Sequence, residues 1–513
     1  MSDWKNQAYL LRERGTKGFW AGLLASLPIV GALLALPPLL GILSPLQPLV
    51  GWLVLAMPPV LFSFLLELLG YWAKILLMVG ILAMLTAAGG GMGGVWASLA
   101  LWMPWRRVGT GERSWWVVDA VALSLFLWFL AWAWSLTSGT DYFPWPFFVP
   151  LSLAYSASLT YMYRRLSSIA AKSPSPVVDL GRRQFVGKLS VGIVAVAAGG
   201  ALYRFYSPLE RLGIASSVTT PPPSEITPND KFYTVSKNFF DPVVSSAGWR
   251  LRVQGLVGRP LSLSYEELKA LPQVMEMVTL ECISNSVGGD LMGNARWRGV
   301  PLAFLLGTAG VKPEVQDVVF RATDDYADSI PLSKALDEAT LVAYEMNGEP
   351  LSPKHGFPAR IIVPGIYGMK NVKWVTDIEL VDHDFLGFWQ EVGWSDEASI
   401  KTTSRIDWPV NGLRLPMGMV GLTGVAVGGD RGIVRVEVST DGGKQWQPAQ
   451  LQEARSSYSW VLWRYSWFPA GPGTYDIKVR AIDGTGWPQA SVVAEPFPDG
   501  ASGYHTVFVQ IIA

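Results

Sequence analysis

The single cysteine of this 513-residue chain stands where a strand gives way to a loop. Cys282 ends the strand-like segment 278–282, and a stretch rich in serine, asparagine and glycine follows it. A strand end is a rigid place for a thiol, and a loop leaves space around it. A thiolate suits a soft or high-valent redox metal, whereas a lone cysteine is also commonly a small buried hydrophobe. The motif by itself leaves both interpretations open.

A second group of polar residues lies further along the chain. The run 355–360 reads His-Gly-Phe-Pro-Ala-Arg, and the glycine-rich run 364–374 contains Lys370 and Lys373. Glycines allow backbone N–H groups to approach an anion, while arginine and lysine can neutralise a phosphate. These runs predict either a phosphate-binding loop or an ordinary basic loop.

Short apolar runs separated by turn signals surround both groups and predict an α+β domain over residues 225–410. A helix is expected at 264–271, and strands are expected at 249–255, 278–282, 318–321, 360–363 and 375–380.

The last part of the chain, 411–513, is predicted to be all-β. Expected strands lie at 434–439, 460–467 and 474–481, with Asp-Gly turns between strands. This regular spacing indicates an immunoglobulin-like β-sandwich, for which we expect a structural or dimer-forming role.

The first part of the chain is apolar and carries little charge, which predicts an α-helical transmembrane bundle over residues 1–170. We expect the stretch 73–105 to form two short spans that turn at the glycine run 89–94. The positive-inside rule then gives six spans, because the three basic groups between the apolar stretches must all lie in the cytoplasm. The other spans are expected at 18–42, 47–70, 115–137 and 145–163.

Residues 171–208 contain Arg182 and Arg183, then an aromatic residue, a lysine and an apolar run. This order predicts a twin-arginine export signal and seventh span; an ordinary seventh span is the alternative. Both place the residues after 208 outside the cytoplasm, beyond a proline-rich linker at 209–224. We therefore expect a multi-pass cell-membrane protein in contact with the lipid bilayer, with its catalytic domain on the extracytoplasmic side.

Charge and histidine content exclude two classes of function. The formal net charge is zero, so no basic field indicates nucleic-acid binding. All three histidines, His355, His383 and His505, lie after the apolar stretches, so the predicted spans cannot hold a haem between two histidines. A quinone site in the spans stays open.

The cysteine motif, the Trp-Arg-Gly-Val-Pro-Leu segment 297–302, the run 355–360 and the Gly-Met-Lys-Asn-Val-Lys-Trp run 368–374 occur in the order seen in the sulfite oxidase family. The resemblance to this molybdopterin-dependent oxidoreductase family covers about 225–510. It implies an α+β sulfite-oxidase-like molybdopterin domain and a dimerisation-type sandwich. It also implies a molybdenum–molybdopterin cofactor with one protein thiolate, which Cys282 matches, and no fused haem.

The resemblance also implies which residues bind the cofactor. His355 and Arg360 match residues that hold the pterin and its phosphate, and the loop that carries Lys370 matches the phosphate loop. The cofactor-binding set implied in this way is Asn229, Phe232, Tyr233, Cys282, Asp325, Ser329, His355, Arg360, Gly368, Lys370 and Lys373.

Two departures from the family pattern bear on the substrate. Cys282 lacks the Ala-Gly-Asn and paired arginines that follow it in sulfite oxidases, and Trp394 stands where the family has an active-site tyrosine. Trp394 and Asn285 are expected to border the substrate pocket.

We therefore expect oxygen-atom transfer that reduces an S-oxide or N-oxide. The alternative is a sulfite dehydrogenase, whose substrate is an oxyanion. Electrons would pass to a separate electron-transfer partner or the quinone pool, and a homodimer is possible. The rival of another class is a cofactor-free, membrane-tethered binding module.

Overall fold

The computed structural model describes residues 3–40, 71–99, 145–171, 224–238 and 241–513. The chain divides into two compact units. The described part of the first unit is helical, and the described part of the second unit contains all the β-structure.

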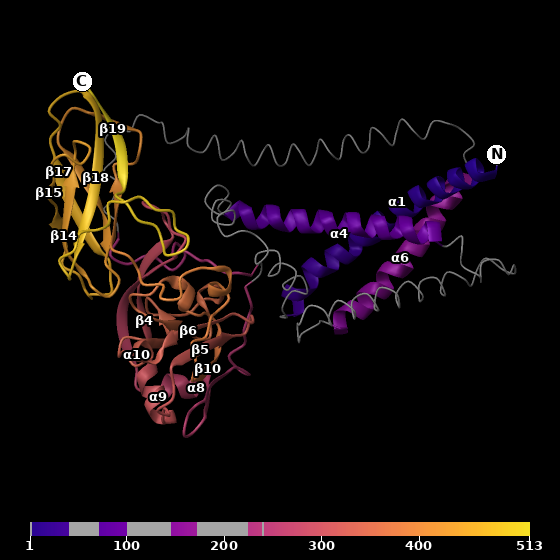
Figure 1. The fold of residues 1–513 in the computed structure, drawn as a ribbon, viewed down its shortest axis with the longest axis horizontal. Helices are drawn as coiled ribbons and strands as arrows, with labels where there is room; N and C mark the ends of the chain where they lie inside the picture. The colour runs from indigo at the N-terminus through magenta and orange to yellow at the C-terminus, as the bar shows by residue number, and fades with distance from the viewer. Residues whose placement is uncertain (1–2, 41–70, 100–144, 172–223, 239–240) are drawn as a thin grey trace. The chain divides into compact units, whose positions relative to one another are not determined.

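The helical unit contains α1 (Asp3–Leu40), α4 (Tyr71–Leu99) and α6 (Trp145–Ala171) (Figure 1). Helices α1 and α4 pack with glycines facing each other, so that a Cβ atom on Gly22 would collide with the carbonyl oxygen of Gly89. Helix α6 joins them through Tyr155, whose hydroxyl donates to the Gly89 carbonyl at 2.6 Å.

The predicted turn in the glycine run 89–94 is wrong, because α4 continues through it. Each glycine costs a helix about 1 kcal/mol relative to alanine. Here the missing side chains allow the backbones of α1 and α4 to approach closely, and this packing offsets that cost. Since α4 is one helix where two spans were expected, the count of six spans is not supported.

Among the described helices, the 19-residue stretch Val79–Ala97 is long and apolar enough to cross a membrane by length and composition. The predicted spans 47–70 and 115–137 lie outside the described residues. So do all but the end residues of the predicted export signal, 171–208, and of the linker, 209–224.

The predicted α+β domain contains two sheets. The first has the strand order β2-β1-β10-β5-β6, and the second has the order β3-β4-β7-β8 with β9 paired to β7. The first-sheet strands are β1 (Arg250–Gly255), β2 (Leu261–Ser264), β5 (Asp317–Ala322), β6 (Ala327–Pro331) and β10 (Val375–Val381). The second-sheet strands are β3 (Val274–Glu281), β4 (Met292–Pro301), β7 (Leu341–Met346), β8 (Glu349–Pro350) and β9 (Arg360–Ile362).

Short helices pack around these sheets. The helix predicted at 264–271 is confirmed. Helix α8 (Tyr265–Ala270) begins at Ser264, whose side chain accepts from the Glu267 backbone while the Glu267 carboxylate accepts from the Ser264 backbone. This reciprocal cap explains the helix start. The others are α9 (Leu302–Ala309), α10 (Leu332–Ala335) and the 3₁₀ turns η3 (Pro353–His355), η4 (Gly368–Lys370) and η5 (Gln390–Val392).

The C-terminal residues form the predicted two-sheet sandwich around one apolar core (Figure 1). Strand β11 pairs with β13, so the sandwich includes residues ahead of the predicted boundary at 411. One sheet contains β11 (Thr403–Trp408), β13 (Val420–Val427), β17 (Val461–Trp467) and β16 (Gln450–Leu451). The other contains β12 (Leu413–Pro416), β19 (Thr506–Ile512), β18 (Gly473–Asp483), β14 (Ile433–Ser439) and β15 (Gln447–Pro448).

The sandwich packs directly against β3 and the segment that follows it. The Trp460 backbone N–H donates to Thr279 Oγ1 at 2.7 Å, and Arg405 Nη1 donates to the Gly289 carbonyl at 2.8 Å. Side chains from both domains, including Ile283 and Val425, share one apolar cluster. The sandwich therefore helps to position the loop that carries the cysteine.

Candidate active site

A single large cavity brings together most of the residues that the sequence singled out. It encloses about 940 Å³, including its open mouth, and lies between the end of β3, the segment 232–237 and the loops around η3, η4 and η5. Its lining includes Phe232, Tyr233, Cys282, His355, Arg360, Gly368, Lys373 and Trp394.

Cys282 comes directly after β3 and faces this cavity. Its backbone N–H donates to the Leu291 carbonyl at 2.9 Å, which closes the loop, and Sγ lies 3.1 Å from Ser284 Oγ. Burial raises the pKa of the Cys282 thiol. A positively charged metal at this position would favour the thiolate and offset that burial.

The surroundings of His355 favour the neutral form of its ring. Burial is the main cause that lowers its pKa, and the nearby Arg360 guanidinium adds to the effect. Nε2 lies 2.8 Å from the Asn229 carbonyl oxygen, which can only accept, so the hydrogen is on Nε2. The Nδ1 atom is therefore an acceptor. Phe232 packs edge-on against the ring and fixes its orientation.

Arg360 is a buried cation with few partners. Its guanidinium donates to two carbonyls, those of His355 at 3.3 Å and Asn371 at 3.1 Å, and lies 5.0 Å from the Trp297 ring centroid. Its Nε atom is buried without a hydrogen-bond partner, and burial lowers its pKa to about 10. No carboxylate of the described residues forms an ion pair with it. A bound anion would neutralise this buried charge.

Two glycines let the chain approach closely around this cation. A Cβ atom on Gly368 would come 2.6 Å from the Tyr233 hydroxyl oxygen, so a larger residue would push the η4 loop away from the cavity wall. Gly356 ends η3 with a φ of 103°, a left-handed conformation that favours glycine. Beside it, Lys373 lines the cavity, and its Nζ donates to the Lys354 carbonyl at 3.3 Å.

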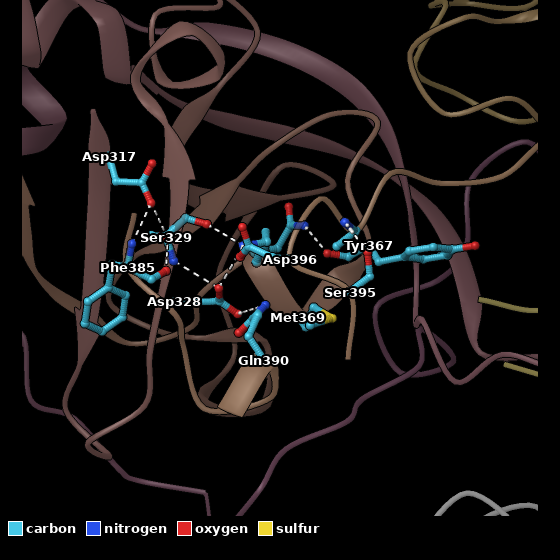
Figure 2. A network of polar contacts seen from close by, with 12 residues as sticks. Asp317, Asp328, Ser329, Tyr367, Met369, Phe385, Gln390, Ser395 and Asp396 are labelled. Atoms are coloured by element: carbon cyan, nitrogen blue, oxygen red, sulfur yellow. Dashed lines mark hydrogen bonds and ion pairs between the residues drawn. The ribbon is translucent and has the colours of Figure 1, made fainter. Parts of the chain in front are cut away.

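Lys370 does not line the cavity, which corrects its expected place in a phosphate loop. Its ammonium donates to Asp328 Oδ1 at 3.2 Å, the Ser329 carbonyl at 2.8 Å and Asp396 Oδ1 at 2.8 Å. Figure 2 shows Asp328, Ser329 and Asp396 in this network, with Gln390 beside Asp328. Every proton of the ammonium has an oxygen acceptor within the protein, so Lys370 is a structural cation.

Four other predicted residues also lie away from the cavity. Asp325 is exposed, and Ser329 is buried with its hydroxyl within hydrogen-bond distance of two acceptors, Asp317 Oδ2 and the Phe385 carbonyl. The side chain of Asn229 forms hydrogen bonds with Asn347 and Glu349. The backbone carbonyl of Asn229 accepts the hydrogen bond from His355 Nε2.

Asn285 is the fourth of these residues, and its hydrogen bonds stabilise the loop that carries Cys282. Its side chain donates to Glu281 Oε1 at 2.8 Å and accepts from the Leu291 backbone at 3.0 Å. The structure thus gives Asn285 partners within the loop rather than a place on the cavity wall.

Sequence reasoning missed Lys237, Asp324 and Tyr326, which line the cavity. Lys237 Nζ donates to the Asp324 carbonyl at 2.7 Å, and burial lowers the pKa of this lysine. Asp324 and Tyr326 are the sequence neighbours of Asp325, so the segment was identified and the residues facing inward were not. A lysine a few positions after Phe232 was the available signal for Lys237.

Tryptophans form another part of the cavity wall. Trp389 and Trp394 both line the cavity, and the Trp394 backbone N–H donates to the Trp389 carbonyl at 3.1 Å. Trp394 packs edge-on against Phe497, with ring centroids 5.2 Å apart. This wall therefore depends on packing and carries no phenol at position 394.

Two family models match the second half of the chain. A model described as "Oxidoreductase molybdopterin binding domain" matches residues 239–389, and one described as "Mo-co oxidoreductase dimerisation domain" matches residues 399–493. The cavity residues Cys282, His355 and Arg360 all fall within the first match.

The chain is also similar to curated sulfite oxidases. It is 35% identical to human mitochondrial sulfite oxidase over 317 residues, which is 51% of this chain and 58% of that protein. It is 33% identical to sulfite oxidase of Gallus gallus over 318 residues, which is 51% of this chain and 69% of that protein. The chain thus spans only about three fifths of the mitochondrial relatives it matches.

A solved structure shares the fold. The sulfane dehydrogenase SoxCD from Paracoccus pantotrophus matches with a TM-score of 0.50 and 25% sequence identity. The match covers 57% of this chain and 82% of that chain.

Proposed function

The chain belongs to the sulfite oxidase family of molybdopterin-dependent oxidoreductases, and we propose that it oxidises a small sulfur compound by oxygen-atom transfer. Sulfite is the first substrate to test. The observation that carries the proposal is the meeting of Cys282, His355 and Arg360 on one cavity. A thiolate, an imidazole acceptor and an unpaired cation are suited to hold an anionic metal cofactor.

The cavity residues fit a phosphorylated molybdenum–pterin. Arg360 has a buried, unpartnered Nε and two bonds to carbonyls, so a phosphate would supply the missing charge and acceptors. Among the described residues, no group of three or more His, Cys, Asp and Glu side chains could hold a metal by themselves. The other ligands of a metal at Cys282 would then come from the cofactor.

Each residue has a definite task in this proposal. The bound molybdenum–pterin supplies the two-electron chemistry. His355 donates through Nε2 to the Asn229 carbonyl and thereby presents Nδ1 as an acceptor to the pterin. Arg360 neutralises the phosphate. Trp389 and Trp394 restrict the entry of water.

The oxidative direction is supported by the named relatives. The curated matches are sulfite oxidases, and the matching solved structure is a sulfane dehydrogenase. Lys237 adds a cation to the cavity lining that could attract an oxyanion substrate. These observations favour the sulfite dehydrogenase alternative over the reductive reaction that the sequence led us to expect.

Reduction of an S-oxide or N-oxide is a second candidate, favoured by the makeup of the cavity wall. Of the described residues that line the cavity, Arg360 is the one arginine, and its contacts are with the His355 and Asn371 carbonyls. Lys237 lies beside Asp324, and Met369, Trp389 and Trp394 carry no charge. A neutral substrate would suit the part of the wall that these residues form; Lys354 and Lys373 also line the cavity.

A side-by-side assay separates the two reactions. Sulfite-dependent reduction of ferricyanide by the full chain, without oxidation of reduced viologen by methionine sulfoxide or trimethylamine N-oxide, is the expected result. Viologen oxidation with no sulfite turnover would overturn the oxidative proposal and favour the second candidate.

Electrons would leave through a separate partner protein or a quinone, and the match to a dimerisation domain favours a homodimer. We also propose that the helical unit attaches the enzyme to a membrane, supported by the stretch Val79–Ala97. Retention in the membrane pellet after alkaline carbonate extraction is expected, and release into the supernatant would contradict attachment.

Export of the second unit to the extracytoplasmic side is tested by replacing Arg182 and Arg183 with lysine. Loss of external protease access to residues 224–513 is expected, and unchanged access would exclude the twin-arginine signal.

A further inference from the structure

The loop after β3 brings a hydroxyl group to the thiol of Cys282. Ser284 Oγ lies 3.1 Å from Cys282 Sγ, and both residues line the cavity. A residue two positions along the chain thus places a hydroxyl group beside the sulfur.

The direction of the hydroxyl bond follows from metal binding. A thiolate that ligates a metal has no proton, so it can only accept, and Ser284 must then donate. A hydrogen bond to a charged acceptor is stronger than one between neutral groups. The contact is therefore expected to strengthen in the loaded protein.

The position of Ser284 is fixed by the surrounding turn. The Asn285 backbone N–H donates to the Cys282 carbonyl at 2.9 Å, and the Asn285 side chain holds both Glu281 and Leu291. Arg405 of β11 holds the far end of the loop through the Gly289 carbonyl. These bonds close the turn on both sides, so the hydroxyl is held beside the sulfur.

We propose that Ser284 is a positioning residue that tunes the redox potential of the metal through Cys282. The inference rests on the proposed function, because it requires a metal bound at this thiolate. A hydrogen bond withdraws electron density from the sulfur, so the thiolate donates less to the metal. The more reduced metal is then relatively stabilised, and its potential is higher than with an unbonded thiolate.

The test compares Ser284→Ala with Ser284→Thr in the full-length holoenzyme. Ser284→Ala removes the hydroxyl, whereas Ser284→Thr keeps it. Ser286→Ala serves as the matched control, since Ser286 is in the same loop but does not line the cavity. Molybdenum content, the sulfur-to-metal absorption band and the midpoint potential from an EPR-monitored titration are measured for each protein.

We expect Ser284→Ala to retain molybdenum, to shift the absorption band to lower energy and to lower the midpoint potential. A tenfold change in the redox equilibrium would correspond to about 59 mV for a one-electron step. Ser284→Thr and Ser286→Ala should stay close to the wild type. A loaded Ser284→Ala protein with the wild-type band and potential would overturn this inference alone. A wild-type protein without molybdenum would overturn the proposed function as well.

Discussion

Arg360 and Lys370 are both almost fully buried, with exposed fractions of 5% and 2%, yet their surroundings differ. Lys370 bonds to two carboxylates and a carbonyl, whereas Arg360 bonds to two carbonyls and keeps an unpartnered Nε. Lys370 lies behind the cavity wall and Arg360 faces the cavity. Burial of a cation therefore does not by itself identify a binding residue. We propose that the balance between the charge and its partners distinguishes the cofactor-binding Arg360 from the structural Lys370.

Replacing Lys370 with Met should give the largest loss of stability. The fully buried Asp328 would lose its ion-pair partner, which typically costs about 3–5 kcal/mol. Chemical denaturation of the detergent-solubilised chain measures the free energy of unfolding. Lys269→Met is the control, because Lys269 pairs with Glu266 at the surface and such pairs contribute at most about 1 kcal/mol.

The double variant Asp328→Asn with Lys370→Met sharpens the interpretation. Removing both charges should recover a large part of the lost stability, since the buried carboxylate is gone and the remaining partner, Asp396, is partly exposed to water. A double variant as unstable as Lys370→Met alone would show that packing, rather than the ion pair, accounts for the loss.

His505 should have a smaller, pH-dependent effect on the free energy of unfolding, because burial favours its uncharged form. Burial and the nearby Arg405 lower its pKa from 6.5 to about 4, and Nδ1 accepts from the Ile406 backbone at 2.9 Å. Between these pH values the unfolded chain binds the additional proton. The stabilisation by neutral His505 is thus complete above pH 6.5 and is lost as the pH falls through 4.

We expect the wild type to lose on the order of 2 kcal/mol more unfolding free energy than His505→Gln between pH 7 and pH 4. Parallel stability curves for the two proteins over this range would exclude His505 as the cause.

Arg360→Met should give the smallest change in stability and a nearly complete loss of cofactor. The variant removes two bonds to carbonyls but also an unpaired buried charge, so the apoprotein should change by about 1 kcal/mol or less. Pterin released on denaturation should fall to background. Arg321→Met is the control, since Arg321 is a surface residue paired with Glu379. Normal pterin content in Arg360→Met would remove Arg360 from the cofactor site.

Local patterns predicted much of the second unit. The strand that ends before Cys282, the helix after Ser264 and the hairpin strands of the sandwich follow from apolar alternation, caps and turns. That the side chains of His355 and Arg360 face the cavity could be predicted only from the resemblance to the family, which the order of the motifs carries. Periodicity cannot tell which neighbour in a turn faces a cavity, as Asp325 and Tyr326 illustrate.

Long-range partners could not be predicted from the sequence. The carboxylates that neutralise Lys370 come from β6 and from residue 396, so no local pattern distinguishes it from Lys373. The glycine run in α4 likewise indicates a turn when considered alone. It is helical because α1 packs against it closely, which depends on a second segment.

Molybdenum and pterin content of the full-length chain tests the central claim most directly. We expect about one molybdenum per wild-type chain, with pterin released on denaturation. We also expect loss of the visible sulfur-to-metal absorption in Cys282→Ala. A well-folded wild-type chain without molybdenum or pterin, prepared where the cofactor is made, would contradict the account and favour the cofactor-free binding module.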